Sequence, residues 1–131
     1  MHDERLDGLS ELQLDILRIL WEQGESSASE VREALEPERS FAASTVATML
    51  TRLEKRGVVV RHQDGRSVTF SADVEEQEVR ESMVSDLMSR LFGGDAQALV
   101  SHLLESGEID PKELDALRAE IRRRRRRKGG R

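Results

Sequence analysis

Short hydroxyl side chains and longer cationic side chains share one segment in the middle of the 131-residue chain. From Ser44 to Lys55 they fall opposite the apolar residues of a helical pattern, with hydroxyls first and cations later. A helix in the DNA major groove suits that order, because hydroxyls near its start reach base edges and longer cations reach phosphates or a guanine. The segment and the residues after it predict a DNA-binding surface formed by Ser44, Thr45, Thr48, Arg52, Lys55, Arg61 and Arg66.

The distribution of charge supports this prediction, although the net charge of the chain is −5. Residues 1–38 carry a net charge of −8 and residues 67–121 a net charge of −9, whereas residues 39–66 carry +4 and residues 122–131 add eight positive charges. The middle of the chain is a basic island in an acidic protein, where a phosphate-binding surface is expected. A polar helix face alone is more typical of ordinary solvated surface, so the prediction also depends on the neighbouring elements.

Three helices are predicted in the first part of the chain. Capping boxes begin helices at Ser10 and Ser27, Gly24 and Pro37 end them, and a third helix is expected within residues 40–57. Their apolar residues recur at helical spacing and predict one shared core. With two residues of the following hairpin, that core comprises Leu12, Ile16, Leu20, Val31, Leu35, Val46, Leu50, Leu53, Val68 and Phe70.

A β-hairpin is predicted directly after the third helix. The β-rich runs 58–63 and 66–71 flank Asp64-Gly65, and glycine supplies the positive φ that a tight turn needs. Three helices followed by such a two-stranded wing predict a winged helix-turn-helix domain over residues 8–73. The basic and imidazole side chains expected on the wing are Arg61, His62 and Arg66.

The rest of the chain is predicted to be helical and to pair with a second copy of itself. Residues 75–92, 96–104 and a segment beginning at Asp110-Pro111 each carry an apolar face. The winged helix closes its own core, so these faces have little left to cover them within one chain. The predicted dimerisation residues are Val79, Met83, Val84, Leu87, Met88, Leu91, Phe92, Leu99, Leu103, Leu114 and Leu117.

The predicted fold class is therefore mostly α with a small β-hairpin. A winged helix-turn-helix domain over residues 8–73 is followed by an all-helical dimerisation domain over residues 74–121. Residues 122–131 form a block of like charge and are predicted to be a disordered basic tail.

Composition argues against several other functions. The chain has no cysteine, and His2, His62 and His102 share no metal-ligand spacing, so no metal site is expected. No catalytic triad pattern, phosphate-cradling glycine loop or partnered carboxylate pair is present, so neither an enzyme nor a cofactor is expected. No run of 18 apolar residues and no secretory signal occur, which predicts a cytoplasmic protein without a membrane partner.

The sequence resembles the penicillinase-repressor family of the BlaI/MecI type, whose relatives include copper-responsive CopY-type repressors. The resemblance extends over residues 9–121, and the Thr-Val-x-Thr-Met-Leu-x-Arg-Leu pattern at 45–53 is its most specific part. The segments that carry it are LSELQLDILRILW at 9–21, SEVREAL at 29–35, STVATMLTRLEKRGVVVR at 44–61, DGRSVTFSA at 64–72 and LFGGDAQALVSHLLESGEIDPKELDALR at 91–118.

The resemblance implies a homodimeric transcriptional repressor. Each winged helix would read one half-site of an inverted-repeat operator in double-stranded DNA, with the third helix in the major groove. Thr45, Thr48 and Arg52 match the family's recognition-helix positions, and Arg66 matches a wing position. Ser44 departs from the basic residue that some relatives carry there.

Two departures from the family bear on regulation. Copper-responsive relatives use clustered cysteines, and this chain has none. Other relatives are inactivated by a protease that cuts an Asn–Phe bond, and His102-Leu103 stands at that position here. The resemblance therefore suggests an inducing protease as a partner, but the residues at the expected cleavage position do not support it.

A second class of function stays open on the sequence alone. The overall acidity, with a net charge of −9 over residues 67–121, also suits a winged-helix module that binds proteins and not DNA. Salt dependence distinguishes the two, because binding to DNA phosphates weakens steeply as salt rises.

Overall fold

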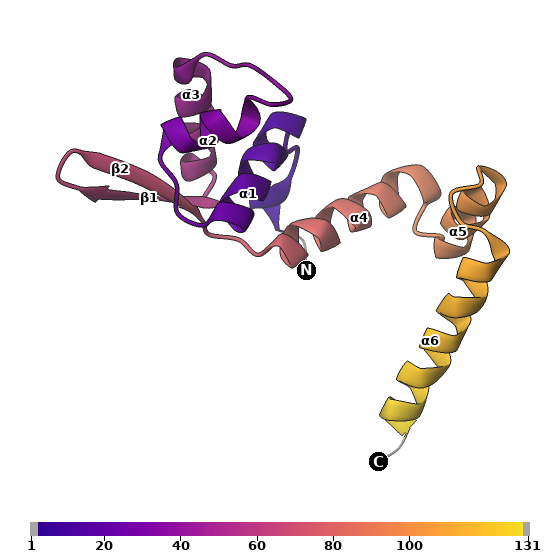
Figure 1. The fold of residues 1–131 in the computed structure, drawn as a ribbon. Coiled ribbons are helices and arrows are strands. Elements are labelled where there is room, and N and C mark those ends of the chain that lie inside the picture. Colours follow the sequence, from indigo (N-terminus) through magenta and orange to yellow (C-terminus); the bar gives the residue numbers. More distant parts are fainter. Residues whose placement is uncertain (1–2, 130–131) are drawn as a thin grey trace. The chain divides into compact units, whose positions relative to one another are not determined.

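The computed structural model describes residues 3–129, in which six α-helices, one 3-10 helix and a two-stranded antiparallel sheet are present (Figure 1). This element order confirms the predicted fold class, mostly α with a small hairpin. The elements are η1 (Glu4–Leu6), α1 (Glu11–Gln23), α2 (Ala28–Leu35), α3 (Ala43–Lys55), β1 (Val59–Asp64), β2 (Ser67–Ala72), α4 (Glu76–Phe92), α5 (Ala96–Glu105) and α6 (Pro111–Gly129).

The chain divides into two compact units, Met1–Val84 and Ser85–Arg131. The first contains α1, α2, α3, the hairpin and the beginning of α4, and the second contains the end of α4 with α5 and α6. The division falls within α4, and the predicted domain boundary after residue 73 stays a prediction. His2 and the last two residues of the predicted tail lie outside the described residues.

Both predicted capping boxes are present in the first unit. The Ser10 hydroxyl accepts from the amide of Gln13 at 3.1 Å, and Gln13 Oε1 accepts from the amide of Ser10 at 3.0 Å. Ser27 and Glu30 make the same exchange at the start of α2, at 3.1 and 3.0 Å. These bonds satisfy amides that lack partners within a helix, which explains why α1 and α2 begin where they do.

One hydrophobic core holds the first unit together. Of the ten residues predicted for it, Leu12 and Val68 are only half-buried, and the other eight are buried. Val79 of α4 is also part of this core, at 2% exposure. The remaining buried apolar residues, which the predicted core did not include, are Leu6, Leu17, Ile19, Val58, Val59 and Val74.

The hairpin turns at Gly65, whose φ of 61° is the positive value that the sequence predicted. The sheet gains one further pairing that was not predicted. Ser26, between α1 and α2, donates its amide to the carbonyl of Phe70 at 2.9 Å and accepts from the amide of Phe70 at 2.8 Å. Ser26 is buried, so this pairing fixes the hairpin to the helices instead of leaving it as a free arm.

In the second unit, aspartates begin the two helices after α4. The Asp95 carboxylate accepts from the amides of Gln97 and Ala98, at 3.0 and 3.2 Å, and Asp110 accepts from the amide of Glu113 at 2.9 Å. These caps match the predicted starts of α5 and α6. Within residues 3–129, none of the helices combines the length and apolar character that a membrane span requires.

The end of α6 differs from the predicted disordered tail, because the helix continues to Gly129. Glu120 accepts hydrogen bonds from Arg123 and from Arg124, the latter at 3.2 Å, one turn further along. Arginine is a good helix former, and cations in the last turn interact favourably with the helix dipole. The prediction from like charge alone left out these local contributions.

Candidate nucleic-acid interface

Helix α3 presents one polar face opposite its core face. Val46, Leu50 and Leu53 are fully buried at 0% exposure, and this fixes the rotation of the helix about its axis. The polar face follows from the spacing of its residues by three or four positions. On it Ser44, Thr48, Arg52 and Lys55 are exposed and Thr45 is half-buried.

The exposed side chains of this face have no partners within the described chain. Ser44, Thr48, Arg52 and Lys55 make no side-chain hydrogen bond or ion pair with residues 3–129. The N-cap residue of α3 is Ala42, which provides no side-chain hydrogen bond, whereas α1 and α2 begin with capping boxes. The face therefore offers uncommitted donors, two of them cationic, together with first-turn amides, which suits an anionic ligand.

The six basic residues of the segment 39–66 divide into two groups. Arg39 pairs with Glu11 and lies 3.3 Å from a carboxylate oxygen of Asp15, and Arg56 binds backbone carbonyls near the N-terminus. The other four make no ion pair with the described residues. These four are Arg52, Lys55, Arg61 and Arg66, which are the cations that the sequence predicted for DNA binding.

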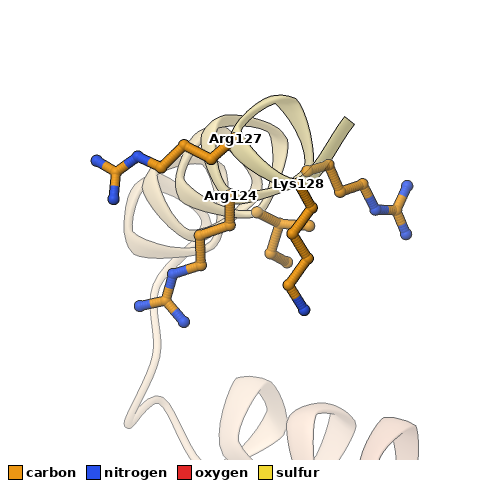
Figure 2. A pocket seen from close by; sticks show the side chains of 5 residues that line it. Arg124, Arg127 and Lys128 are labelled. Atoms are coloured by element: carbon orange, nitrogen blue, oxygen red, sulfur yellow. The ribbon is translucent and has the colours of Figure 1, made fainter. Parts of the chain in front are cut away.

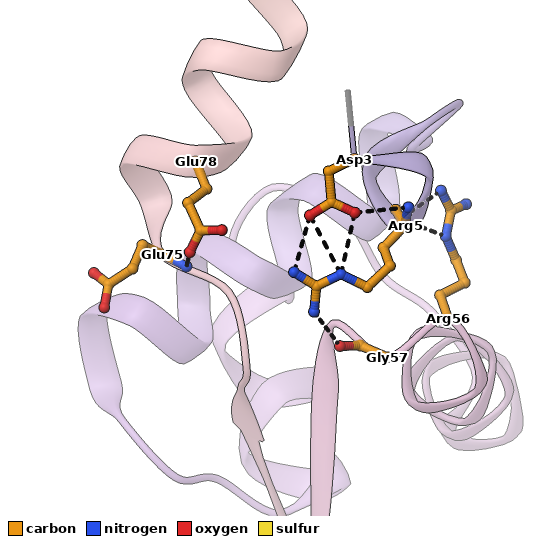
Figure 3. Close-up of polar contacts among 6 residues, drawn as sticks. All are labelled: Asp3, Arg5, Arg56, Gly57, Glu75 and Glu78. Atoms are coloured by element: carbon orange, nitrogen blue, oxygen red, sulfur yellow. Dashed lines mark hydrogen bonds and ion pairs between the residues drawn. The ribbon is translucent and has the colours of Figure 1, made fainter. Parts of the chain in front are cut away.

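Arg56 ends α3 and anchors it to the N-terminal segment. Its guanidinium donates to the carbonyl of Arg5, from Nε at 3.1 Å and from Nη2 at 2.9 Å, and Nη2 also donates to the carbonyl of Asp7. Arg5 in turn donates from Nη1 to the carbonyl of Gly57 at 3.0 Å (Figure 3). The connection from α3 to the hairpin and the N-terminal segment therefore bind each other through two arginines, one from each segment.

The Arg5 side chain is itself held by a carboxylate. Its Nε and Nη2 donate to Asp3 at 3.1 and 2.9 Å (Figure 3). The hydrogen bond to Asp3 and the charge of that carboxylate raise the pKa of Arg5, and the charges of Glu78 and Asp73 add to the effect. Neither Arg5 nor Arg56 was predicted as a positioning residue, because the backbone carbonyls that they bind lie 49 to 52 positions away in sequence.

Arg32 is a third positioning residue that the sequence did not reveal. Its Nε donates to the carbonyl of Phe41 at 2.9 Å, across the loop between α2 and α3. This bond fixes the loop just before α3 begins. A lone arginine on a predicted helix carries no local pattern for such a role.

The wing carries its two predicted cations in open positions. Arg61 and Arg66 are exposed, and Arg66 follows directly after the turn at Gly65. The imidazole of His62 lies 2.7 Å from the Ser71 hydroxyl and 3.6 Å from a carboxylate oxygen of Glu25. His62 is therefore engaged within the protein, and the wing offers arginine as its free cation.

The predicted dimerisation residues differ in exposure. Leu91 is 72% exposed, and Met83, Val84 and Leu87 on the same helix are between 40% and 51% exposed. Leu117 of α6 is 50% exposed. The half-buried members of the set are Met88, Phe92, Leu99, Leu103 and Leu114.

Val79 does not belong with this set. It is packed in the core of the first unit, so it has no surface left to offer a second chain. The helical stripe from Val79 to Phe92 continues without a break in sequence, and for that reason the pattern could not separate its first residue from the rest.

No group of His, Cys, Asp and Glu side chains that could hold a metal ion occurs in the part of the chain that the structure describes. His102 contacts a ring instead, with its centroid 6.1 Å from that of Phe92.

Three packed helices, an attached hairpin and an uncommitted cationic face on α3 define a winged-helix protein with a candidate surface for nucleic acid. The chain belongs to the penicillinase repressor family, which it matches over residues 9–123. This match confirms the resemblance found in the sequence.

The relatives are similar over most of their length. A penicillinase repressor of Staphylococcus aureus is 24% identical over 110 residues, which cover 84% of this chain and 87% of the relative. The methicillin resistance regulatory protein MecI of Mammaliicoccus sciuri is 23% identical over 116 residues, which cover 88% of this chain and 94% of the relative.

Solved structures share the fold. Bacillus licheniformis BlaI, as a monomeric form in complex with the blaP half-operator, superposes with a TM-score of 0.50 and 24% identity, over 60% of this chain and 93% of that chain. A MarR family protein from Bacillus stearothermophilus gives a TM-score of 0.50 with 20% identity, over 93% of this chain and 76% of that chain.

Proposed function

We propose that the protein is a homodimeric transcriptional repressor that binds an inverted-repeat operator in double-stranded DNA. The observation that carries the proposal is the exposed face of α3, where Ser44, Thr48, Arg52 and Lys55 have no partners among the described residues. Hydroxyls near the start of a helix and cations near its end suit a helix in the major groove. Arg61 and Arg66 of the wing would contact the adjacent phosphates.

The family supports this proposal. The similar BlaI structure is a complex with a half-operator, and the similar proteins of Staphylococcus aureus and Bacillus licheniformis are named penicillinase repressors. The division of the basic residues adds an argument from this chain alone. Within residues 39–66, Arg39 and Arg56 bind carboxylates or carbonyls of the protein itself, and the four cations left open lie on the helix and hairpin that a winged helix uses for DNA.

The apolar surface on α4 supports a second copy of the chain as the partner. Met83, Leu87 and Leu91 recur every four residues and share one helix face, and all are at least 40% exposed. Full burial of a leucine or methionine side chain contributes roughly 1.5–3 kcal/mol, and covering the exposed part of each of these three would contribute the corresponding fraction. Two chains paired by a two-fold axis match the symmetry of an inverted repeat, so one interface serves both purposes.

In this proposal the protein acts by binding alone. Occupying the operator blocks transcription without a catalytic step or a cofactor, in the cytoplasm where the DNA is. The family's protease-sensitive position is occupied by His102-Leu103 within α5, so an inducing protease would need a different bond in this chain.

A selection from random DNA tests the proposal. The full chain is incubated with a pool of random duplexes, bound duplexes are recovered and amplified over several rounds, and the enriched sequences are aligned. We expect a consensus with two related half-sites in inverted orientation, separated by about one helical turn. A pool that stays random would contradict DNA recognition, and a consensus with one unrepeated half-site would contradict the dimer.

A further inference from the structure

Seven consecutive cationic residues, 122–128, occupy the last turns of α6. All seven are exposed, and the segment contains no apolar side chain. The face on α3 does not account for this segment, which lies in the other compact unit. We call residues 122–128 the basic end of α6.

Most of the positive charge in the basic end is uncompensated. Glu120 binds Arg123 and Arg124, and no other ion pair within residues 3–129 reaches the basic end. Like charges four positions apart on a helix repel one another, so an anionic partner would relieve a cost that the free helix carries. The cations without an ion pair are Arg122, Arg125, Arg126, Arg127 and Lys128.

The basic end presents its charge around the helix. Arg124, Arg127 and Lys128 extend away from the helix axis in different directions (Figure 2). Together with Arg125 they line a concave region over Ile121. A single small anion would occupy only one side of such a helix, whereas an extended polyanion can contact several of its cations.

We propose that the basic end of α6 is a second DNA-binding surface, which contacts the phosphate backbone and carries no sequence information. A helix advances about 1.5 Å per residue and duplex DNA carries one negative charge per about 1.7 Å, so the two charge densities match. Arginine also binds phosphate through paired N–H donors. The inference rests on the proposed function for its choice of DNA and adds a surface beyond the winged helix.

The chemistry of the segment disfavours a membrane as the partner. Helices that lie on a bilayer need apolar side chains opposite their cations. The apolar residues of α6 end at Ile121, and the basic end has none of its own. A hydrophilic polyanion is therefore the better match for residues 122–128.

The test measures binding of the full chain to a random-sequence duplex, by fluorescence anisotropy at salt concentrations from about 50 to 200 mM. One variant changes Arg122, Arg125, Arg126, Arg127 and Lys128 to Gln, which is also a good helix former and leaves the two arginines paired with Glu120. Each phosphate contact contributes about 0.9 to the slope of log affinity against log salt. We expect the Gln variant to bind more weakly, with a slope shallower by up to about 4.5 if all five cations contact phosphates.

A matched control changes the same four arginines to Lys and so keeps every charge. It should retain the wild-type slope, and circular dichroism should show the same helix content in all three proteins. The position of protection on a selected operator should not change in either variant, which separates this inference from the proposed function. Equal slopes for the wild type and the Gln variant would overturn the inference. Binding to phosphatidylserine vesicles that the Gln variant loses, with the DNA slope unchanged, would also overturn it.

Discussion

The guanidinium of Arg56 donates two hydrogen bonds to the backbone carbonyl of Arg5, although 51 positions separate the two residues. Arg5 donates in return to the carbonyl of Gly57, the residue after Arg56. Arg56, the residue that follows the end of the proposed recognition helix at Lys55, is thereby bound to the N-terminal segment. Lys55 precedes Arg56 directly but makes no such contact, so neighbouring cations serve different purposes: one holds the fold and the other is open to a ligand.

This difference predicts that substitutions at the two neighbouring positions affect different properties, stability for Arg56 and DNA binding for Lys55. Arg56→Gln removes charged donors from the carbonyls of Arg5 and Asp7 and should lower the free energy of unfolding by about 1 kcal/mol. Lys55→Gln should change it by less than about 0.5 kcal/mol, as at other open surface sites, while weakening binding to DNA. Urea unfolding and a mobility-shift titration measure the two effects. Equal losses of stability in both variants would contradict the assignment.

The capping box at the start of α2 predicts a dependence of stability on pH. Hydrogen bonds from the amide and the hydroxyl of Ser27 lower the pKa of Glu30. A carboxylate with a lowered pKa stabilises the fold above its ordinary pKa, about 4.5, and this stabilisation is lost as pH falls through the lower, folded-state value. We therefore expect the urea concentration at the unfolding midpoint of the wild type to decrease as the pH is lowered through this range, in part because Glu30 becomes protonated.

Glu30→Gln isolates this contribution, because glutamine keeps the reciprocal bond of a capping box without a titrating group. Carboxylates of this kind titrate between about pH 5 and about pH 3. Over this range the variant should lose less stability than the wild type. Glu33→Gln on the same helix removes an exposed carboxylate with no capping role and serves as the control. If Glu30→Gln and Glu33→Gln show the same acid response, the cap does not cause the pH dependence.

The open apolar face of α4 predicts the effect of a single charge on assembly. Leu87→Asp places a carboxylate in the middle of the proposed interface and should give monomers with weakened operator binding. Ser89→Asp adds the same charge to the same helix, away from the stripe of Met83, Leu87 and Leu91, and should leave dimers. Sedimentation at micromolar concentration measures the mass. A wild-type protein with the mass of one chain would contradict the dimer.

Val79 gives a prediction that separates core from interface. Val79→Ala removes two methyl groups from a fully packed position and should lower the free energy of unfolding by about 2 kcal/mol. The association of folded chains should not change, because Val79 is buried within one chain. Denaturant unfolding and sedimentation of the same samples measure both properties. A Val79→Ala protein that is monomeric but as stable as the wild type would contradict the core assignment and show that Val79 contributes to the interface.

Local patterns predicted the elements, and long-range contacts explain what the patterns missed. The capping boxes at Ser10 and Ser27 and the turn at Gly65 depend on residues within four positions, so the sequence sufficed for them. The pairing of Ser26 with Phe70 and the contact of Arg5 with Gly57 join distant positions that share no sequence pattern. These two contacts add to the core packing that holds the hairpin and α3.

The sequence sufficed to predict which side chains share one face of a helix. It did not show which side chains of a face are covered by a neighbouring element. Periodicity placed Ser44, Thr48, Arg52 and Lys55 opposite the core, because a helix face follows from spacing alone. The same periodicity included Val79 among the exposed apolar residues, since a stripe does not show which of its members a neighbouring element covers. The helix at residues 122–129 was missed because the reasoning weighed repulsion alone and omitted the bonds to Glu120.

The central claim is that the exposed face of α3 reads DNA, and one titration tests it most directly. A duplex enriched from the random pool is titrated with the wild type, with Arg52→Ala and with Arg18→Ala, which removes an exposed arginine from α1. We expect Arg52→Ala to weaken binding by about 5-fold to 150-fold, the cost of about 1–3 kcal/mol for a lost base contact, and Arg18→Ala to bind like the wild type. Equal affinity of Arg52→Ala and the wild type for the selected duplex would contradict the account.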